Sequence, residues 1–110
     1  MAIPHAYPGM PVDVRPLGEA LAKNETTALV KNNDFEAIRL VLRQGKEVCH
    51  EHEVDGMITV YCIEGRVALT TGGASHELPA GYWTYLMRQD PHTLRALEDS
   101  SVLLTIMLHR

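Results

Sequence analysis

The chain has 110 residues, of which 45% are hydrophobic and 22% charged, a balance that predicts one globular domain and excludes extensive disorder. The formal net charge is -4 and the lysines and arginines are scattered, so we expect no nucleic-acid partner. The sequence has neither an apolar run of membrane-spanning length nor a secretory signal pattern, and its two cysteines are not paired as CxxC. These features predict a cytoplasmic protein with reduced thiols and no membrane contact.

The first 30 residues differ in character from the rest of the chain. Residues 1–16 are rich in proline, which excludes a helix interior or a central strand and predicts an extended arm. Residues 17–23 allow a short helix that ends near Asn24. We therefore divide the chain into an N-terminal arm, residues 1–30, and a single domain, residues 31–110.

Beyond the arm, the sequence predicts short strands separated by turns. Residues 35–43 alternate apolar and polar side chains, as a strand with one buried face does. Further extended segments are expected at residues 46–52, 57–63, 66–71, 74–78, 82–87, 92–97 and 102–108. The turn signals include Glu64-Gly65 and Gly72-Gly73. Eight or nine strands with almost no helix predict an all-β sandwich or barrel that can enclose one small ligand cavity.

Three histidines form the candidate functional site. His50 and His52 are one residue apart in an extended segment, so their side chains share a face, and His92 begins another expected strand. Three imidazoles suit a divalent transition metal such as Fe, Ni, Mn or Zn, and they leave positions for water or substrate. In the alternative, His52 and His92 line a metal-free pocket and hydrogen-bond to each other or to water.

His76 is a candidate for an extra ligand. Ala74 and Leu78 lie on the same face of its strand, which favours a buried histidine in the core or an interface. Aromatic side chains gather a little further along the chain. They either line a ligand pocket or bury an interface, and the set comprises Tyr61, Tyr82, Trp83 and Tyr85, together with Met87.

The segments 45–65 and 81–96 resemble the paired motifs of the cupin superfamily of small β-barrels. The second motif of that family reads G-x5-P-x-G-x2-H-x3-N, and its spacing is met here from Gly81 to His92. The proline, glycine and asparagine of the motif are replaced by Met87, Gln89 and Ala96. The resemblance covers about residues 35–108.

The first cupin motif, G-x5-H-x-H-x(3–4)-E-x6-G, is matched less closely. Counted back from Gly65 with the shorter spacing, its first histidine is His52 and its glutamate position is Ile58. The longer spacing places its two histidines at Glu51 and Glu53. The resemblance therefore carries over His52 and His92 as ligands, without the carboxylate that metal-binding cupins of this pattern use.

The resemblance also implies a pocket inside the barrel. If the register of the family holds, Ile58 and Cys62 point inward, and we expect them to line this pocket with Met87. Nothing near Cys62 in the sequence would lower the pKa of its thiol, so a small core residue is the plainer interpretation.

The resemblance, closest to small single-domain RmlC-like cupins, implies a double-stranded β-helix, a jelly-roll-like barrel, and a homodimer. We expect a pocket for a small polar molecule, held through a divalent metal; if the protein is an enzyme, dioxygenase, isomerase or lyase chemistry fits the fold. A non-catalytic binding or sensing module with a metal-free pocket is the main alternative. A structural homodimer with a vestigial pocket is a weaker third hypothesis.

Overall fold

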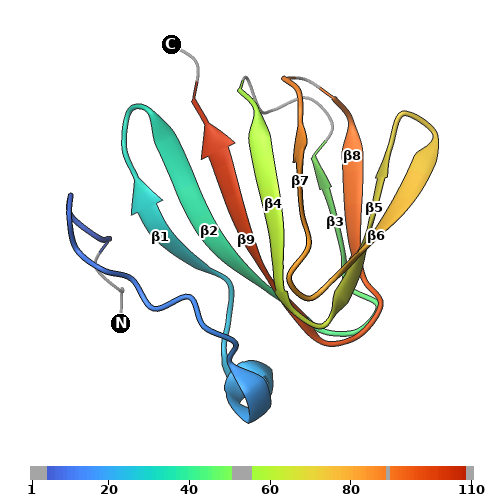
Figure 1. Cartoon of the computed structure of the whole chain (residues 1–110), viewed down its shortest axis with the longest axis horizontal. Coiled ribbons are helices and arrows are strands. Elements are labelled where there is room, and N and C mark those ends of the chain that lie inside the picture. The colour runs from blue at the N-terminus through green and yellow to red at the C-terminus, as the bar shows by residue number, and fades with distance from the viewer. Residues whose placement is uncertain (1–4, 51–55, 89, 109–110) are drawn as a thin grey trace.

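The computed structural model describes residues 5–50, 56–88 and 90–108, and these consist mostly of antiparallel β-structure (Figure 1). A 3-10 helix, η1 (Gly18–Lys23), precedes the strands and ends at Asn24, as the sequence predicted. The strands are β1 (Thr27–Lys31), β2 (Phe35–Leu42), β3 (Glu47–His50), β4 (Ile58–Glu64), β5 (Arg66–Thr71), β6 (Ala74–Pro79), β7 (Trp83–Leu86), β8 (His92–Ala96) and β9 (Ser100–Met107).

The strands form two antiparallel sheets. The five-stranded sheet has the order β1-β2-β9-β4-β7, and the four-stranded sheet has the order β3-β8-β5-β6. Strands distant in sequence are neighbours, since β9 pairs with both β2 and β4. Figure 1 shows the two sheets facing each other like the walls of a barrel. The all-β prediction is confirmed.

The core lies between the sheets and follows the alternation of the strands. Along β2, Leu40 and Leu42 are buried toward the core, while Val41 between them is only half-buried. The same inward alternation gives Val60 and Cys62 on β4 and Val102 and Leu104 on β9. Burying these apolar side chains stabilises the fold by about 25 cal/mol for each Å² removed from water.

The turn between β4 and β5 carries the chain from one sheet to the other. Gly65 has φ +81°, a left-handed conformation that residues with a Cβ rarely adopt. A Cβ at this position would also collide with Ser100 Oγ and the Asp99 carbonyl oxygen. The Glu64-Gly65 turn predicted from the sequence is therefore one that requires glycine.

Glu64 fastens the arm to the barrel. Its carboxylate accepts hydrogen bonds from the backbone N–H groups of Leu17 (2.8 Å) and Gly18 (3.0 Å) and from the Ser101 hydroxyl. Burial alone would raise the pKa of this carboxyl. The three hydrogen bonds and the positive charge of Arg39 outweigh burial and hold the pKa of Glu64 below its ordinary value.

Arg39 lies under the same part of the arm. It is only 6% exposed, and its Nη2 donates to the Asp13 carbonyl oxygen at 3.3 Å. Leu21 of η1 is buried as well, so the arm packs on the barrel. The strand β1 pairs with β2 and begins within the segment that the sequence assigned to the arm.

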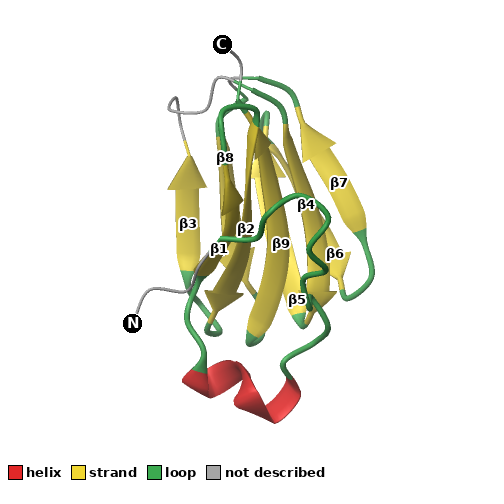
Figure 2. Cartoon of the chain, turned by 90° about the vertical axis from the view of Figure 1, so that its left-hand side faces the viewer, coloured by secondary structure: helices red, strands yellow, loops and turns green. Residues whose placement is uncertain are grey.

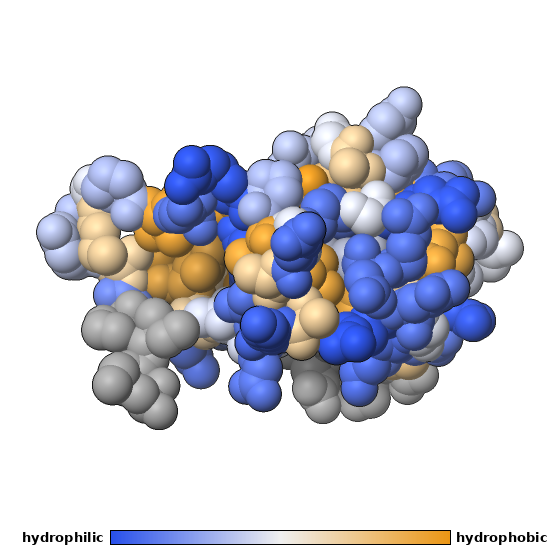
Figure 3. Space-filling model, turned by 90° about the horizontal axis from the view of Figure 1, so that it is seen from below, coloured by the Kyte–Doolittle hydropathy of each residue, from blue (hydrophilic) through white to orange (hydrophobic). Residues whose placement is uncertain are grey.

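The short helix η1 lies at one end of the barrel. At the lower end in Figure 1, η1 lies beyond the strands, and the side view of Figure 2 shows the same arrangement. Seen from below, this end is largely hydrophilic, with hydrophobic residues showing between polar ones (Figure 3). The described part of the chain contains no helix that is long and apolar enough to cross a membrane.

Candidate functional site

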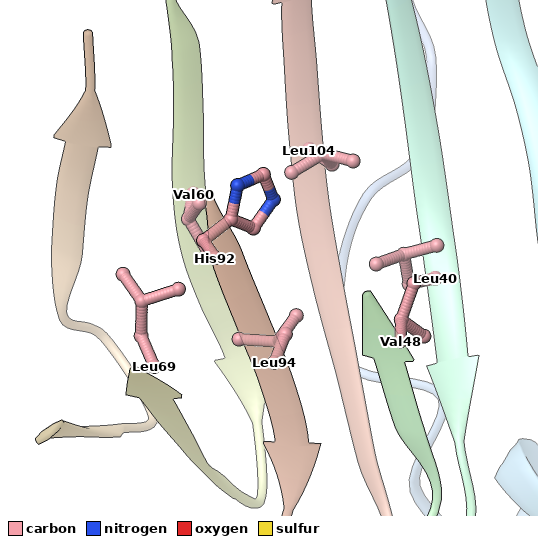
Figure 4. Close-up of a pocket in the computed structure, with 7 residues that line it drawn as sticks. All are labelled: Leu40, Val48, Val60, Leu69, His92, Leu94 and Leu104. Carbon is pink, nitrogen blue, oxygen red and sulfur yellow. The ribbon is translucent and has the colours of Figure 1, made fainter. Parts of the chain in front are cut away.

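His92 is the candidate site residue that the structure places most clearly. It is the first residue of β8, it is 6% exposed, and its ring lies between the two sheets (Figure 4). The cavity beside it measures about 10 Å³, which is room for about one water molecule. Its apolar lining comes from both sheets and consists of Leu40, Val48, Val60, Leu69, Leu94 and Leu104.

The ring of His92 is oriented by the turn that precedes it. Nδ1 lies 3.2 Å from the carbonyl oxygen of Asp90. A carbonyl oxygen only accepts, so Nδ1 carries the proton and the lone pair of the neutral ring lies on Nε2. The Asp90 carboxylate in turn accepts the backbone N–H of Met87 at 3.0 Å, which fixes the turn. Metal-ligating histidines are commonly held in this way, with one ring nitrogen donating to a carbonyl.

The strand register brings the backbone of His50 opposite His92. In the β3–β8 pair, His50 is the cross-strand partner of His92 and Cys49 is the partner of Thr93. The carboxyl end of β3 and the amino end of β8 both lie at the upper end of the barrel in Figure 1. The side chain of His50 and the whole of His52 lie outside the described residues. The three-histidine set therefore stays a prediction, supported at His92 by burial and orientation.

His76 lies away from this site. It sits on β6, opposite Leu69 of β5, but unlike Leu69 it is exposed. The expectation of a buried histidine is wrong because β6 is the last strand of its sheet and leaves His76 uncovered. Among the described residues, no three His, Cys, Asp or Glu side chains are grouped so that they could hold a metal ion.

The three residues expected to line a pocket lie in different surroundings. Ile58 and Cys62 belong to the core, but neither borders the cavity beside His92. Met87 follows the end of β7 and is exposed. Burial raises the pKa of the Cys62 thiol to about 11, and the thiol donates to the Glu64 carbonyl oxygen at 3.4 Å. At neutral pH and without a metal beside it, this thiol is protonated.

The donor groups decide how well a metal fits here. His92 suits a divalent transition metal because its Nδ1–H is fixed and its Nε2 carries the lone pair. Ile58, at the position where the cupin motif has its carboxylate, is 2% exposed and packs in the core, so it supplies no ligand. His50 and His52, before β4, are the further ligands predicted from the sequence.

Sequence reasoning missed two residues that shape the site and its surroundings. No role was predicted for Asp90 from the sequence, yet it orients His92 and caps the backbone at Met87. Glu64 was predicted only as a turn residue, although it anchors the arm. An aspartate before Pro91 and two residues before a candidate ligand was the available signal for Asp90.

The fold and this site can now be compared with known proteins. The family model described as the cupin domain, Cupin_2, matches residues 39–108. The chain belongs to the cupin family. This confirms the resemblance seen in the two motifs. No curated protein matches this cupin.

Solved structures of similar fold include other small cupins. An RmlC-like cupin from Desulfovibrio desulfuricans is 25% identical, with a TM-score of 0.67 over 74% of this chain and 79% of its own. A conserved protein of unknown function from Streptococcus pyogenes is 19% identical, with a TM-score of 0.75 over 100% of this chain and 96% of its own. Salicylate 1,2-dioxygenase from Pseudoaminobacter salicylatoxidans, solved with gentisate, is 19% identical with a TM-score of 0.66; this cupin matches 24% of that longer chain. Identities at this level show a shared fold.

Proposed function

We propose that this cupin binds a small polar molecule at the upper end of its barrel, through a divalent transition metal held by His92 together with His50 and His52. The observation that carries the proposal is His92 itself. It is a buried imidazole between the two sheets, with Nδ1–H committed to the Asp90 carbonyl and the lone pair on Nε2. The β3–β8 register, which sets the backbone of His50 opposite His92, supports the second ligand.

The residues around His92 explain why a polar group would bind at this position. Leu69, Leu94 and Leu104 place apolar surface beside the ring, and this low local polarity strengthens any bond made to the imidazole. When bound, Fe, Ni, Mn or Zn would supply Lewis-acid or oxygen-dependent chemistry. Dioxygenase, isomerase or lyase activity would fit such a site, and the similar fold of salicylate 1,2-dioxygenase is consistent with the first of these.

A metal-free binding or sensing pocket is the second candidate function. The observation in its favour is Ile58, a buried apolar residue at the position of the cupin carboxylate. In this case His92 would accept a hydrogen bond from a ligand at Nε2. The small volume beside His92 would admit a water molecule or one polar group of a larger ligand.

Metal content separates the two functions. We expect protein purified without a chelator or a metal-affinity column to contain about one equivalent of transition metal per chain. His92→Ala should lose that metal, whereas His76→Ala, which removes an exposed histidine from β6, should keep it. Full metal content in a His52→Ala, His92→Ala double variant would refute the metal site.

If wild-type protein holds no metal and takes up none on titration with Fe(II), Ni(II), Mn(II) or Zn(II), the metal-free function gains support. Thermal unfolding with a panel of small anions and sugars then becomes the test, because a ligand that binds only the native state raises the melting temperature. The rise should disappear in His92→Ala and persist in His76→Ala. A panel that gives no rise with the wild type would count against the sensing pocket.

A further inference from the structure

Arg39 is a buried arginine that forms no ion pair with any carboxylate of the described residues. It is only 6% exposed, and it lies on β2 between Thr27 of β1 and Leu103 of β9. Its Nη2 donates to the Asp13 carbonyl oxygen at 3.3 Å, which is a long hydrogen bond to an uncharged acceptor. Arginine and the other charged residues are almost never this deeply buried unless they are paired. The position of Arg39 therefore calls for a further partner.

The remaining donors of Arg39 reach an accessible surface. An arginine side chain carries five N–H donors and no acceptor, and it stays charged at every pH at which proteins fold. The described residues offer no acceptor to Nε or Nη1 of Arg39. In the same part of the chain, no fully buried side-chain nitrogen or oxygen is without a hydrogen-bond partner. Nε and Nη1 must therefore border open space, where they are available to a molecule beside them.

The space beside Arg39 is a pocket between the arm and the five-stranded sheet. Its volume is about 280 Å³, near the lower limit for pockets that hold small organic molecules. The rest of its lining comes from the arm and consists of Asp13, Arg15, Pro16 and Leu17. Figure 2 shows the loop that leads into η1 crossing in front of this sheet. Glu64 keeps the loop in place, because its carboxylate accepts hydrogen bonds from the backbone at Leu17 and Gly18.

The charges around the pocket leave the guanidinium of Arg39 for an anion. Asp13 and Arg15 neutralise each other, because the Arg15 guanidinium donates to both carboxylate oxygens of Asp13, at 3.0 and 2.8 Å. These hydrogen bonds hold the pKa of Asp13 well below its ordinary value. The Glu64 carboxylate is occupied by two backbone N–H groups and the Ser101 hydroxyl. Of the charged lining residues that the structure describes, Arg39 is thus the one without an ion-pair partner.

The lining favours an anion that carries one charge and an apolar body. A carboxylate matches the planar fork of a guanidinium, which donates two parallel hydrogen bonds to its two oxygens. Pro16 and Leu17 border the same pocket, and an apolar group can pack against them. Asp13 lines the pocket and Glu64 lies near Arg39, and their negative charges repel a doubly charged phosphate more strongly than a singly charged carboxylate.

We propose that the pocket between the arm and β2 binds a small organic acid, with the carboxylate of the acid on Arg39 and its apolar body on Pro16 and Leu17. This site lies under the arm, whereas His92 lies between the two sheets. It needs no metal, so it stands or falls separately from the proposed function. Because the arm forms most of the lining, a bound acid would also hold the arm against the barrel.

Benzoate and butyrate are suitable probes, because each joins one carboxylate to an apolar body. Titration of ¹⁵N-labelled protein with either acid in the presence of EDTA should give saturable shifts of the backbone amide resonances of Leu17, Gly18 and Thr27, with a Kd of about 1 mM or lower. Thr93 and Leu94, which follow His92, should keep their resonances. Benzamide has the shape of benzoate without its charge and should bind about tenfold more weakly or not at all.

Two variants of Arg39 and one control complete the test. Arg39→Gln removes both the charge and the fork, and it should abolish the saturable shifts. Arg39→Lys keeps the charge without the two parallel donors, so binding should weaken by about tenfold. Arg95→Gln removes an exposed arginine from β8 in the other sheet and should leave the affinity unchanged. If Arg39→Gln does not fold, the titrations of the wild type decide, since they locate the site without a substitution.

Several results would overturn the proposal. One is the lack of a saturable shift at Leu17 or Gly18 with either acid up to about 50 mM, which would show that Arg39 only clamps the arm through the Asp13 carbonyl. Another is an affinity for inorganic phosphate or benzamide that equals the affinity for benzoate. The third is full binding in Arg39→Gln. Shifts confined to Thr93 and Leu94 would place the acid near His92 and would likewise refute the site under the arm.

Discussion

Replacing Gly65 by alanine should destabilise the barrel more than the same change at any other turn glycine with a similar backbone. At φ +81° an alanine Cβ is strained by about 1–2 kcal/mol. The added methyl group would also press on Ser100, whose Cα lies 2.8 Å from the Cβ position, and on the Asp99 carbonyl. Such overpacking costs about 1–3 kcal/mol, which gives a total loss of about 2–5 kcal/mol in the free energy of unfolding.

The residues that contact the Cβ position of Gly65 cannot easily move aside. Ser100 Oγ accepts the Arg66 N–H at 3.0 Å and donates to the Glu98 carbonyl at 2.7 Å, so moving it would break hydrogen bonds across the corner between the sheets. Gly73 offers a matched control, because it has the same φ of +81° and nothing within 4 Å of its Cβ position. Gly73→Ala should therefore show the backbone strain alone.

Thermal and urea unfolding, followed by circular dichroism, would measure both variants. The difference between Gly65→Ala and Gly73→Ala isolates the steric term, about 1–3 kcal/mol, and each 1 kcal/mol lowers the melting temperature by about 4–8 °C in a domain of this size. Equal losses in the two variants would refute the reasoning, since they would show that the contacts at Ser100 add nothing to backbone strain.

Two further predictions concern Glu64 and the two cysteines. Glu64→Gln should destabilise the fold by about 1–3 kcal/mol and speed trypsin cleavage within the arm, because a neutral amide is a poorer acceptor for the Leu17 and Gly18 N–H groups. Because the pKa of Glu64 is lowered in the fold, its ionised carboxylate stabilises the fold fully above about pH 4.3, and this stabilisation is lost as the pH falls through the folded pKa. Glu64→Gln should therefore lose less stability than the wild type over that pH range. Identical acid-unfolding profiles for the two proteins would contradict this. A thiol reagent at pH 8 should label the exposed Cys49 at once. The same reagent should label Cys62 only after unfolding, because Cys62 is buried and its pKa is raised to about 11. Equal labelling rates in the native protein would show that Cys62 is accessible.

The strands and their inward faces could be predicted from the sequence because alternation is a local property. Residues 35–43 showed one apolar face, and β2 follows it with Leu40 and Leu42 in the core. The turn at Gly72-Gly73 was equally clear, since both glycines adopt positive φ. These features depend only on residues a few positions apart.

Burial that depends on distant segments could not be predicted in this way. Arg39 occupies an outward position of β2, and it is buried only because the arm at Asp13, 26 residues earlier, lies over it. Conversely, His76 occupies an inward position on β6, yet it is exposed because that strand ends its sheet. In both cases alternation predicts the face of the strand correctly, and the topology decides whether anything covers that face.

The turn before His92 is held together by Asp90. Its carboxylate accepts the Met87 N–H, and its carbonyl oxygen lies within hydrogen-bond distance of His92 Nδ1. Asp90→Ala keeps the carbonyl but removes the hydrogen bond to the Met87 N–H. The loss of this bond costs about 1 kcal/mol and loosens the turn. We therefore expect His92 to lose its fixed tautomer.

Ring ¹⁵N chemical shifts of His92 in metal-free protein would measure that loss. The wild type should show the neutral ring protonated at Nδ1, because the Asp90 carbonyl can only accept a hydrogen bond. Asp90→Ala should show a mixture of tautomers and, if a metal binds, about tenfold weaker affinity, which is typical when support behind a ligand is disturbed. Asp99 is a suitable control, since its carboxylate caps the Gln44 N–H at 2.8 Å in the same manner, close to the turn after β2. An Asp99→Ala variant that shifts the His92 resonances as much as Asp90→Ala does would show that general loosening of the barrel, rather than the turn at Asp90, sets the orientation of the ring.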